Sequence, residues 1–179
     1  MKEYPCFVPF VLLCCFTIAC QDKAARAELE KVENAAQIEE QNKALVRQFF
    51  VAIDAQDFDR FNGLLAPGAI LRGASPQEDI TAENSAQLLR PVYQGLPDLA
   101  HIVEDMFAKG DKVVARVLIQ ATHKGELMGI PPTGKVLRYY QFGIFQIVDG
   151  KIKEGWRVTD SLGMMIQLGM ELKPAEAKK

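Results

Sequence analysis

The chain has 179 residues, of which 49% are hydrophobic and 25% are charged, a composition typical of one globular domain with a short appendage. Its 21 basic and 23 acidic residues give a net charge of −2 and form no long basic run, so a nucleic-acid-binding surface is not expected. All four cysteines precede residue 21. Cleavage of a leader before the last of them would leave a domain with neither a disulfide framework nor a cysteine metal site.

The first 19 residues have the features of a signal peptide. Residues 7–19 (FVPFVLLCCFTIA) are uncharged, which suits the apolar core of a signal peptide, whereas a membrane-spanning helix needs roughly 20 apolar residues. The small residues before Cys20 resemble the bacterial lipobox, in which the cysteine is lipidated and becomes the mature N-terminus. We therefore expect a lipid-anchored protein of the bacterial cell envelope that faces the periplasm or the cell surface. An uncleaved N-terminal membrane anchor is the alternative.

Helices are predicted for most of the first half of the chain. Residues 20–41 predict a tether or helical spacer because they are rich in Ala, Glu, Lys and Gln and contain neither Pro nor Gly. The apolar residues of the next stretch, 42–55, recur at helical spacing and predict the first core helix. The elements expected after it are a helix over residues 57–65 capped by Asp57, a short strand over 69–72, and a third helix that Thr81 caps and Pro91 kinks.

The second half of the chain predicts an antiparallel sheet. Four runs rich in β-branched and aromatic residues are separated by short turns, including Asp149-Gly150, and strands joined so closely must be antiparallel. These runs are residues 101–107, 113–123, 136–148 and 152–160. A last helical turn over 162–168 and a disordered tail over 171–179 complete the chain. Helices followed by a meander of strands predict an α+β fold with the helices on one face of a curved sheet.

Several motifs in this region resemble those of SnoaL-like polyketide (ester) cyclases, which share the nuclear transport factor 2-like fold. Residues 122–135 (THKGELMGIPPTGK) are similar to the run THxGEFxGIPPTGK of that family. The other matches, in the family's order, are LPDL at 96–99, GIFQI at 143–147, DGKI at 149–152, EGW at 154–156, Asp160, and QLG at 167–169. The resemblance covers residues 42–170, which we take as the SnoaL-like domain.

The resemblance implies a fold, a reaction and an assembly. The fold is a cone of helices packed on a curved antiparallel sheet that encloses an apolar pocket. The reaction is ring closure by an intramolecular aldol condensation, with a pocket acid or base and no metal or organic cofactor. Family members are commonly dimers through the outer face of the sheet, so a homodimer is expected.

The chain departs from the family pattern at its usual acid/base positions. Gly143 stands where family members often carry an acidic residue or His. Gly155 and Arg157 replace the His and the carboxylate of the run EHWD. Asp160 is the matched carboxylate that remains, so the sequence is compatible both with an enzyme and with a non-catalytic protein.

Two residues are the candidates for catalysis. Asp160 at the end of a strand could serve as the base that removes a proton next to a carbonyl, or it could cap the helical turn that follows. His123 could relay a proton, or it could bond within the loop that it precedes.

A ligand pocket is expected near the same strands, lined by Tyr140, Phe142, Trp156 and Arg157. Strand alternation places Tyr139 and Tyr140 on opposite faces, so one of the two can point inward. Arg157 inside the pocket would favour an anionic ligand. The two histidines, His101 and His123, do not have the spacing of a metal site, and no phosphate-binding loop or dinucleotide fingerprint is present.

The sequence is therefore compatible with two functions. The first is a cofactor-free enzyme that uses acid/base catalysis on a small, largely apolar carbonyl compound. The second is a non-catalytic envelope lipoprotein that binds a small apolar ligand or a protein partner. Fold alone does not decide between them, because one fold serves many functions.

Overall fold

The computed structural model describes residues 8–75, 77 and 79–171, and it divides the chain into two units, Met1–Ile38 and Glu39–Lys179. The first helix, α1 (Val8–Asp54), contains the described part of the first unit and begins the second. In the first unit its described side chains are exposed, and Leu29 and Val32 are each 58% exposed. No helix among the described residues is long and apolar enough to cross a membrane. The side chain of Cys20 and residues 172–179 lie outside the described part.

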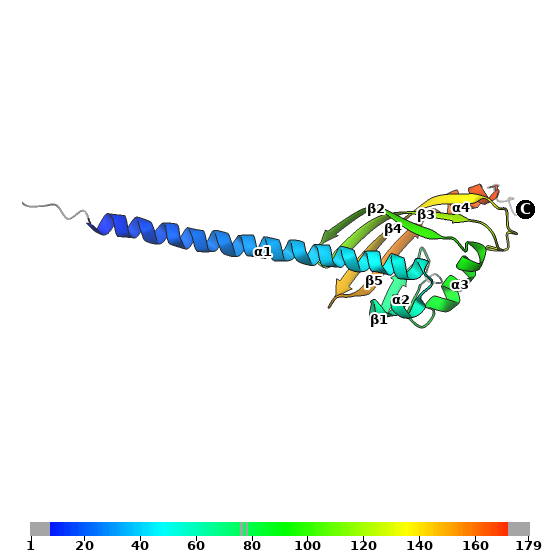
Figure 1. Ribbon diagram of the computed structural model, residues 1–179, viewed down its shortest axis with the longest axis horizontal. Helices are drawn as coiled ribbons and strands as arrows, with labels where there is room; N and C mark the ends of the chain where they lie inside the picture. Colours follow the sequence, from blue (N-terminus) through cyan, green and yellow to red (C-terminus); the bar gives the residue numbers. More distant parts are fainter. Residues whose placement is uncertain (1–7, 76, 78, 172–179) are drawn as a thin grey trace, which may run out of the picture. The chain divides into compact units, whose positions relative to one another are not determined.

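The second unit is built on one five-stranded sheet with the strand order β1-β5-β4-β3-β2 (Figure 1). The strands are β1 (Leu65–Arg72), β2 (Ala100–Lys109), β3 (Lys112–Thr122), β4 (Val136–Val148) and β5 (Lys151–Thr159). The other helices are α2 (Phe58–Gly63), α3 (Ser85–Gly95) and α4 (Ser161–Leu168). The strands β2 to β5 form the predicted antiparallel meander. The predicted α+β class, with helices packed on a curved sheet, is confirmed.

The tight turn between β4 and β5 has the predicted geometry. Asp149 and Gly150 both have positive φ, of 50° and 69°, which is the backbone that a two-residue hairpin turn needs. The turn fixes the register of the two strands, so that Phe145 lies opposite Gly155 and Ile144 opposite Trp156.

The edge strand β1 is longer than the predicted strand over residues 69–72, and its pairing was not predicted. It begins at Leu65, where the second helix was expected to continue, and it runs parallel to β5. The register shifts between Leu65 and Ile70, which lets Pro67 and Gly68 lie within the strand. The long connection from β1 through α3 then leads to β2 at the opposite edge of the sheet.

Helix α3 begins later than predicted. Its first residue is Ser85, and Thr81 lies before the helix instead of capping it. The backbone N–H of Thr81 donates to the side chain of Asn84 at 2.7 Å, so these residues form a turn that leads into the helix. Pro91 lies inside the helix.

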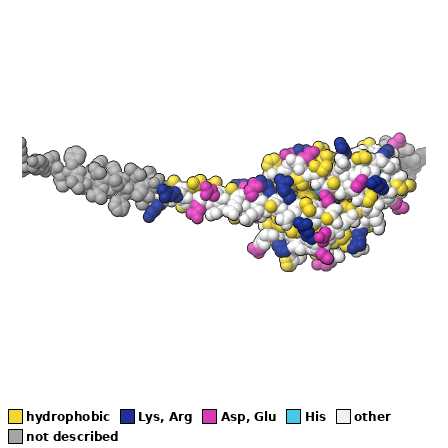
Figure 2. Space-filling model, viewed as in Figure 1, with side chains coloured by type: hydrophobic (Ala, Val, Ile, Leu, Met, Phe, Trp, Pro, Cys, Tyr) yellow, Lys and Arg dark blue, Asp and Glu magenta, His cyan; other side chains and the backbone are white. Residues whose placement is uncertain are grey.

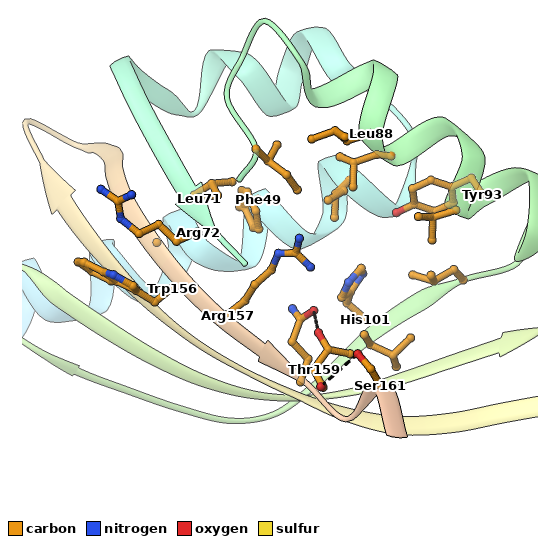
Figure 3. Close-up of a pocket in the computed structure, with 18 of the residues that line it drawn as sticks. Phe49, Leu71, Arg72, Leu88, Tyr93, His101, Trp156, Arg157, Thr159 and Ser161 are labelled. Atoms are coloured by element: carbon orange, nitrogen blue, oxygen red, sulfur yellow. Dashed lines mark hydrogen bonds between the residues drawn. The ribbon is translucent and has the colours of Figure 1, made fainter. Parts of the chain in front are cut away.

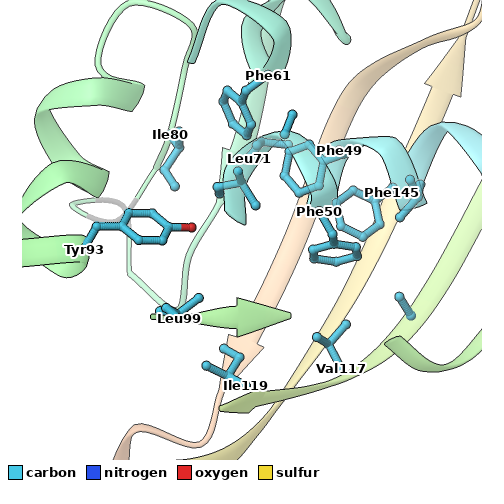
Figure 4. Packing of buried hydrophobic residues seen from close by; sticks show 14 of the residues in the cluster. Phe49, Phe50, Phe61, Leu71, Ile80, Tyr93, Leu99, Val117, Ile119 and Phe145 are labelled. Carbon is cyan, nitrogen blue, oxygen red and sulfur yellow. The ribbon is translucent and has the colours of Figure 1, made fainter. Parts of the chain in front are cut away.

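An aromatic cluster joins the helices to the sheet (Figure 4). Phe49 and Phe50 come from the last turns of α1, and their ring centroids lie 5.4 and 5.9 Å from that of Phe145 on β4. Phe61 of α2 lies 5.0 Å from Phe49. These contacts hold the C-terminal turns of α1 against the inner face of the sheet. On the surface visible in Figure 2, Lys and Arg are interspersed with Asp and Glu.

Candidate functional site

A cavity of about 410 Å³ lies between the inner face of the sheet and the helices α1 and α3 (Figure 3). This volume falls within the usual range of small-molecule sites. The apolar side chains that line it are Phe49, Ile53, Leu71, Ile80, Leu88, Leu89, Val92, Leu99, Ile119, Met128, Phe145 and Trp156. Such a wall favours a largely apolar ligand.

Two strand glycines, Gly155 in the cavity wall and Gly143 on the neighbouring strand, bring no side chain to the inner face of the sheet. A Cβ at Gly155 would lie 2.8 Å from Cδ2 of Leu71, and one at Gly143 would lie 3.0 Å from the Phe145 ring. Larger side chains at these positions would displace the packed Leu71 and Phe145. The inner faces of β4 and β5 therefore carry no polar side chain at these two positions.

A histidine and a carboxylate meet at the cavity. His101 on β2 lines it, and Nδ1 of its ring lies 2.5 Å from Oδ1 of Asp54, the last residue of α1. The other carboxylate oxygen, Oδ2, accepts the backbone N–H of His101 at 2.9 Å. Phe50 stacks on the imidazole at 5.3 Å. The ring is thus held by a carboxylate on its edge and an aromatic ring on its face.

This arrangement assigns the tautomer of His101. An ionised carboxylate only accepts hydrogen bonds, so Nδ1 of His101 donates its proton to Asp54. The neutral ring then carries its lone pair on Nε2. A histidine held in one tautomer by a carboxylate, with its other nitrogen free to accept a proton, has the arrangement of a general base.

Two tyrosines supply hydroxyl groups to the same cavity. Tyr93 on α3 and Tyr139 on β4 both line it, and each is 5% exposed. Burial raises the pKa of Tyr93, with a further contribution from the nearby Asp54 carboxylate, and burial raises the pKa of Tyr139 to about 12. Both phenols are protonated at neutral pH. The hydroxyl of Tyr93 has no hydrogen-bond partner among the described residues, so it remains able to donate to a ligand.

The inner face of β5 adds a cation and a second polar group. Arg157 extends from the strand into the space below α3 (Figure 3). Thr159, the next residue on that face, donates its hydroxyl to Oε1 of Gln141 at 3.1 Å. That bond fixes the Gln141 side chain with its amide nitrogen as the remaining donor.

The model of the SnoaL-like polyketide cyclases matches residues 44–168, which is most of the compact unit. The chain belongs to the SnoaL-like polyketide cyclase family. It is 37% identical over 71 residues to the aklanonic acid methyl ester cyclase DnrD of Streptomyces peucetius, a match that covers 39% of this chain and 49% of the relative. It is 36% identical over 61 residues to the nogalonic acid methyl ester cyclase of Streptomyces nogalater, covering 34% and 46%. The chain therefore spans about half the length of the curated relatives it matches.

Solved structures support the fold of this SnoaL-like chain. AclR of Streptomyces galilaeus is 25% identical with a TM-score of 0.67, over 76% of this chain and 87% of its own. TsrD of Streptomyces laurentii is 28% identical with a TM-score of 0.64, over 73% and 96%. Both overlays cover the greater part of each molecule.

The two residues predicted for catalysis lie outside the cavity of the SnoaL-like domain. Asp160 is exposed and caps α4, where its carboxylate accepts the N–H of Gly163 at 2.8 Å. His123 is fully buried beneath the loop that follows β3, and its Nδ1 accepts the N–H of Thr133 at 3.2 Å. Neither side chain lines the cavity. The alternatives considered from sequence, a helix cap and a loop-bonding histidine, describe these positions.

The four predicted pocket residues divide between the two faces of the sheet. Arg157 lines the cavity, and Trp156 borders it while remaining 37% exposed. Tyr140 and Phe142 lie on the outer face, 41% and 52% exposed, and do not line the cavity. Because side chains alternate along a strand, Tyr139 points into the cavity where Tyr140 points outward.

His101, Asp54 and Tyr93 were missed by sequence reasoning. His101 was considered for metal binding alone, although it stands at the start of a strand that packs on the core. Asp54 ends an amphipathic helix, and Tyr93 lies among the apolar residues of α3. Polar residues at the ends of core elements were the available signal. In the described part of the chain, no three His, Cys, Asp or Glu side chains gather as a metal site requires.

Proposed function

We propose that this chain is a cyclase-type enzyme that closes a ring in a small, largely apolar carbonyl compound by acid/base catalysis without a cofactor. The observation that carries the proposal is the His101–Asp54 pair at the edge of an apolar cavity. The similarity to the ester cyclases of Streptomyces points to the same class of reaction. His101 takes the role of base that Asp160 and His123 were first considered for.

The reaction begins with proton removal from a carbon next to a carbonyl. Nε2 of His101 accepts the proton, the C–H electron pair moves into the enolate, and Asp54 stabilises the imidazolium that forms. The hydroxyl of Tyr93 donates to the developing enolate oxygen. Since Tyr93 has no partner in the described structure, this bond costs no existing one.

Ring closure follows within the same bound molecule. The enolate carbon attacks a second carbonyl carbon, a C–C bond forms, and the new alkoxide takes the proton back from the His101 imidazolium. Substrate and product are isomers, so no oxidant, reductant or second substrate is needed. The apolar wall of the cavity holds the chain of the substrate in a folded shape and excludes water from the enolate.

The test uses aklanonic acid methyl ester in deuterated buffer with the full chain. We expect an isomeric product with altered chromatographic retention. Exchange at the methyl group of 2-acetonaphthone, an apolar aryl ketone, reports proton removal without ring closure. The matched variants are His101→Gln, which removes the base, and Arg138→Gln, a change on the exposed outer side of β4.

Loss of both signals in His101→Gln and their retention in Arg138→Gln would support the proposal. Equal rates in wild type and His101→Gln would contradict it. Absence of both product and exchange in the wild type would favour the second function, a non-catalytic protein that binds a small apolar ligand. The observation behind that alternative is the apolar cavity wall, in which Gly155 brings no side chain.

We propose in addition that the domain is anchored to the membrane of a bacterial cell envelope through a lipid on Cys20. The support is the sequence alone: the uncharged residues 7–19 and the small residues that precede Cys20. Mass spectrometry of the protein from cells should show the lipid adduct on Cys20. Cys20→Ser should abolish the adduct and release the protein from membranes.

We also propose that the outer face of the sheet pairs two copies of the chain. Phe142 lies opposite Val158, and Ile144 lies opposite Trp156, so exposed apolar side chains adjoin on this face. Monomers rarely expose a large contiguous apolar patch. Sedimentation should give a dimer mass for the wild type and a monomer mass for Phe142→Glu.

A further inference from the structure

The loop between β3 and β4 brings one residue, Met128, to the cavity. Met128 lines the cavity, and its side chain is 67% exposed, whereas the next most exposed apolar residue of the lining, Trp156, is 37% exposed. An apolar side chain that both lines a cavity and faces solvent lies where the cavity opens. Met128 is therefore at the mouth, where a bound ligand can cover it.

The backbone of Met128 has a conformation that methionine does not favour. Its φ is 53°, and with Gly129 at 77° it forms a two-residue turn. On either side of this turn, Leu127 and Ile130 exchange backbone hydrogen bonds of 3.1 and 2.9 Å. Such turns prefer Asn, Asp or Gly at the first position, because other side chains crowd the backbone when φ is positive. Asn would suit the turn better, so the turn itself does not account for the methionine.

The loop is fixed to the end of helix α3 close to this turn. The backbone N–H groups of Lys124 and Gly125 both donate to the carbonyl of Gly95, at 2.9 and 3.1 Å. Leu127 is 7% exposed, and a Cβ at Gly95 would lie 3.0 Å from its Cβ, so the residue before Met128 packs against the helix. The neighbouring backbone thus holds Met128 in place, and its own side chain stays free to contact a ligand.

We infer that Met128 is a specificity-determining residue, whose side chain covers the apolar part of the ligand at the mouth of the cavity. Binding removes the exposed side chain and the carbon surface of the ligand from water together, which favours ligands long enough to reach the mouth. An unbranched thioether adapts readily to such a surface. The inference rests on the proposed function, because it takes the carbonyl of the ligand to lie at His101 and Tyr93 with the apolar body toward Met128.

Calorimetric titration of the full chain with two ketones of different length tests this inference. The probes are 2-acetonaphthone and acetophenone, which share the acetyl group and differ by one fused ring. Met128→Asn should weaken the binding of 2-acetonaphthone about threefold to tenfold and that of acetophenone less than about twofold, because the longer ketone alone reaches the mouth. The same substitution should raise the melting temperature, since Asn-Gly is favoured in this turn.

Two further variants separate the side chain of Met128 from its backbone. Gln56→Asn is the matched control, since Gln56 is exposed, has a φ of 54° and does not line the cavity. It should raise the melting temperature and leave both affinities unchanged. Met128→Leu keeps an apolar side chain of similar size and should bind 2-acetonaphthone within about twofold of the wild type.

An unchanged ratio of the two affinities in Met128→Asn would overturn the inference, as would no saturable binding of 2-acetonaphthone to the wild type. A lower melting temperature in Met128→Asn would also overturn it, because the methionine would then serve the fold. The outcome is separable from that of the proposed function. Deuterium exchange that needs His101, with an unchanged ratio in Met128→Asn, would leave the cyclase proposal standing and this inference refuted. A changed ratio without turnover or exchange would leave this inference standing for a binding protein.

Discussion

The chain has two histidines, and the structure gives their Nδ1 atoms opposite hydrogen-bonding roles. At His101, Nδ1 donates to the Asp54 carboxylate, which leaves a lone pair on Nε2 at the cavity. At His123, Nδ1 accepts the N–H of Thr133, which leaves the proton on Nε2 inside the protein. In the proposed mechanism the first ring accepts a proton from a ligand, whereas the second ties a loop to the end of β3. The partner of Nδ1 decides which task each ring can perform.

The surroundings extend this difference. His101 shares its cavity with apolar side chains, the phenols of Tyr93 and Tyr139, and the cation of Arg157. His123 is instead surrounded by backbone hydrogen bonds. Its N–H donates to the carbonyl of Lys135, and its carbonyl accepts the N–H of Gly134, both at 2.9 Å. A fully buried imidazole with this many loop bonds serves folding.

After removal of the base itself in His101→Gln, Asp54→Asn should have the largest effect on activity. The amide can still accept the backbone N–H of His101, but it no longer stabilises the imidazolium or enforces one tautomer. Turnover of aklanonic acid methyl ester should fall by about 10²- to 10⁴-fold. Asp160→Asn is the matched control, since Asn also caps helices, and its rate should equal that of the wild type. Equal losses in the two variants would return Asp160 to the list of catalytic candidates.

Tyr93→Phe should slow turnover by about 10²-fold, the usual cost of losing one donor to an oxyanion. The fold should not weaken, because the hydroxyl makes no hydrogen bond to the described protein. The measurements are kcat and the melting temperature of the same preparation. A lower melting temperature with an unchanged kcat would make Tyr93 a structural residue like His123.

His123→Ala should have the reverse profile. Removal of a fully buried ring and its bonds to Thr133 should lower the free energy of unfolding by about 2 to 4 kcal/mol. The rate per folded molecule should stay at the wild-type value. Urea unfolding measures the free energy of unfolding, and active-site titration gives the rate per folded molecule. A rate that falls more than the folded fraction would contradict the structural role given to His123.

The smallest effect concerns Asp98, which supports the His123 end of the sheet. Its carboxylate accepts the N–H of Thr122 at 2.7 Å and lies 3.3 Å from Nζ of Lys124. The bond from the Thr122 backbone, with help from Lys124, lowers the pKa of Asp98 from its usual 3.8 to about 2. The depressed pKa means that the ionised form stabilises the fold, fully above pH 4 and progressively less as the pH falls toward 2.

Asp98→Asn should therefore melt slightly below the wild type at neutral pH, and the gap should close as the pH falls through this window. The melting temperatures of the two proteins at a series of pH values measure it. A gap that is the same at pH 7 and pH 2 would show that the charge of Asp98 does not contribute.

The meander of strands was predictable because each strand and turn has a local signature, such as Asp149-Gly150 between two β-rich runs. The strand over residues 69–72 was predicted, but the parallel pairing of β1 was not, because the pair of Leu65 and Ile152 joins distant parts of the chain. The loop motifs identified the family. They did not give the length of β1 or the start of α3.

The site was less predictable for two physical reasons. The bond between Asp54 and His101 joins residues 47 positions apart, which no local pattern encodes. The inward face of β4 was ambiguous because the outer residues Tyr140 and Phe142 are as apolar as the inner ones. Alternation showed that Tyr139 and Tyr140 face opposite ways, and only packing decided which of them faces the cavity.

The most direct test of the account is the rate of solvent deuterium exchange into 2-acetonaphthone, measured in parallel for His101→Gln and His123→Gln and expressed per folded molecule. If His101 is the base, its variant should fall to the rate of buffer alone, while the His123 variant keeps the wild-type rate. Exchange that persists in His101→Gln, or that disappears in folded His123→Gln, would contradict the assignment of the two histidines.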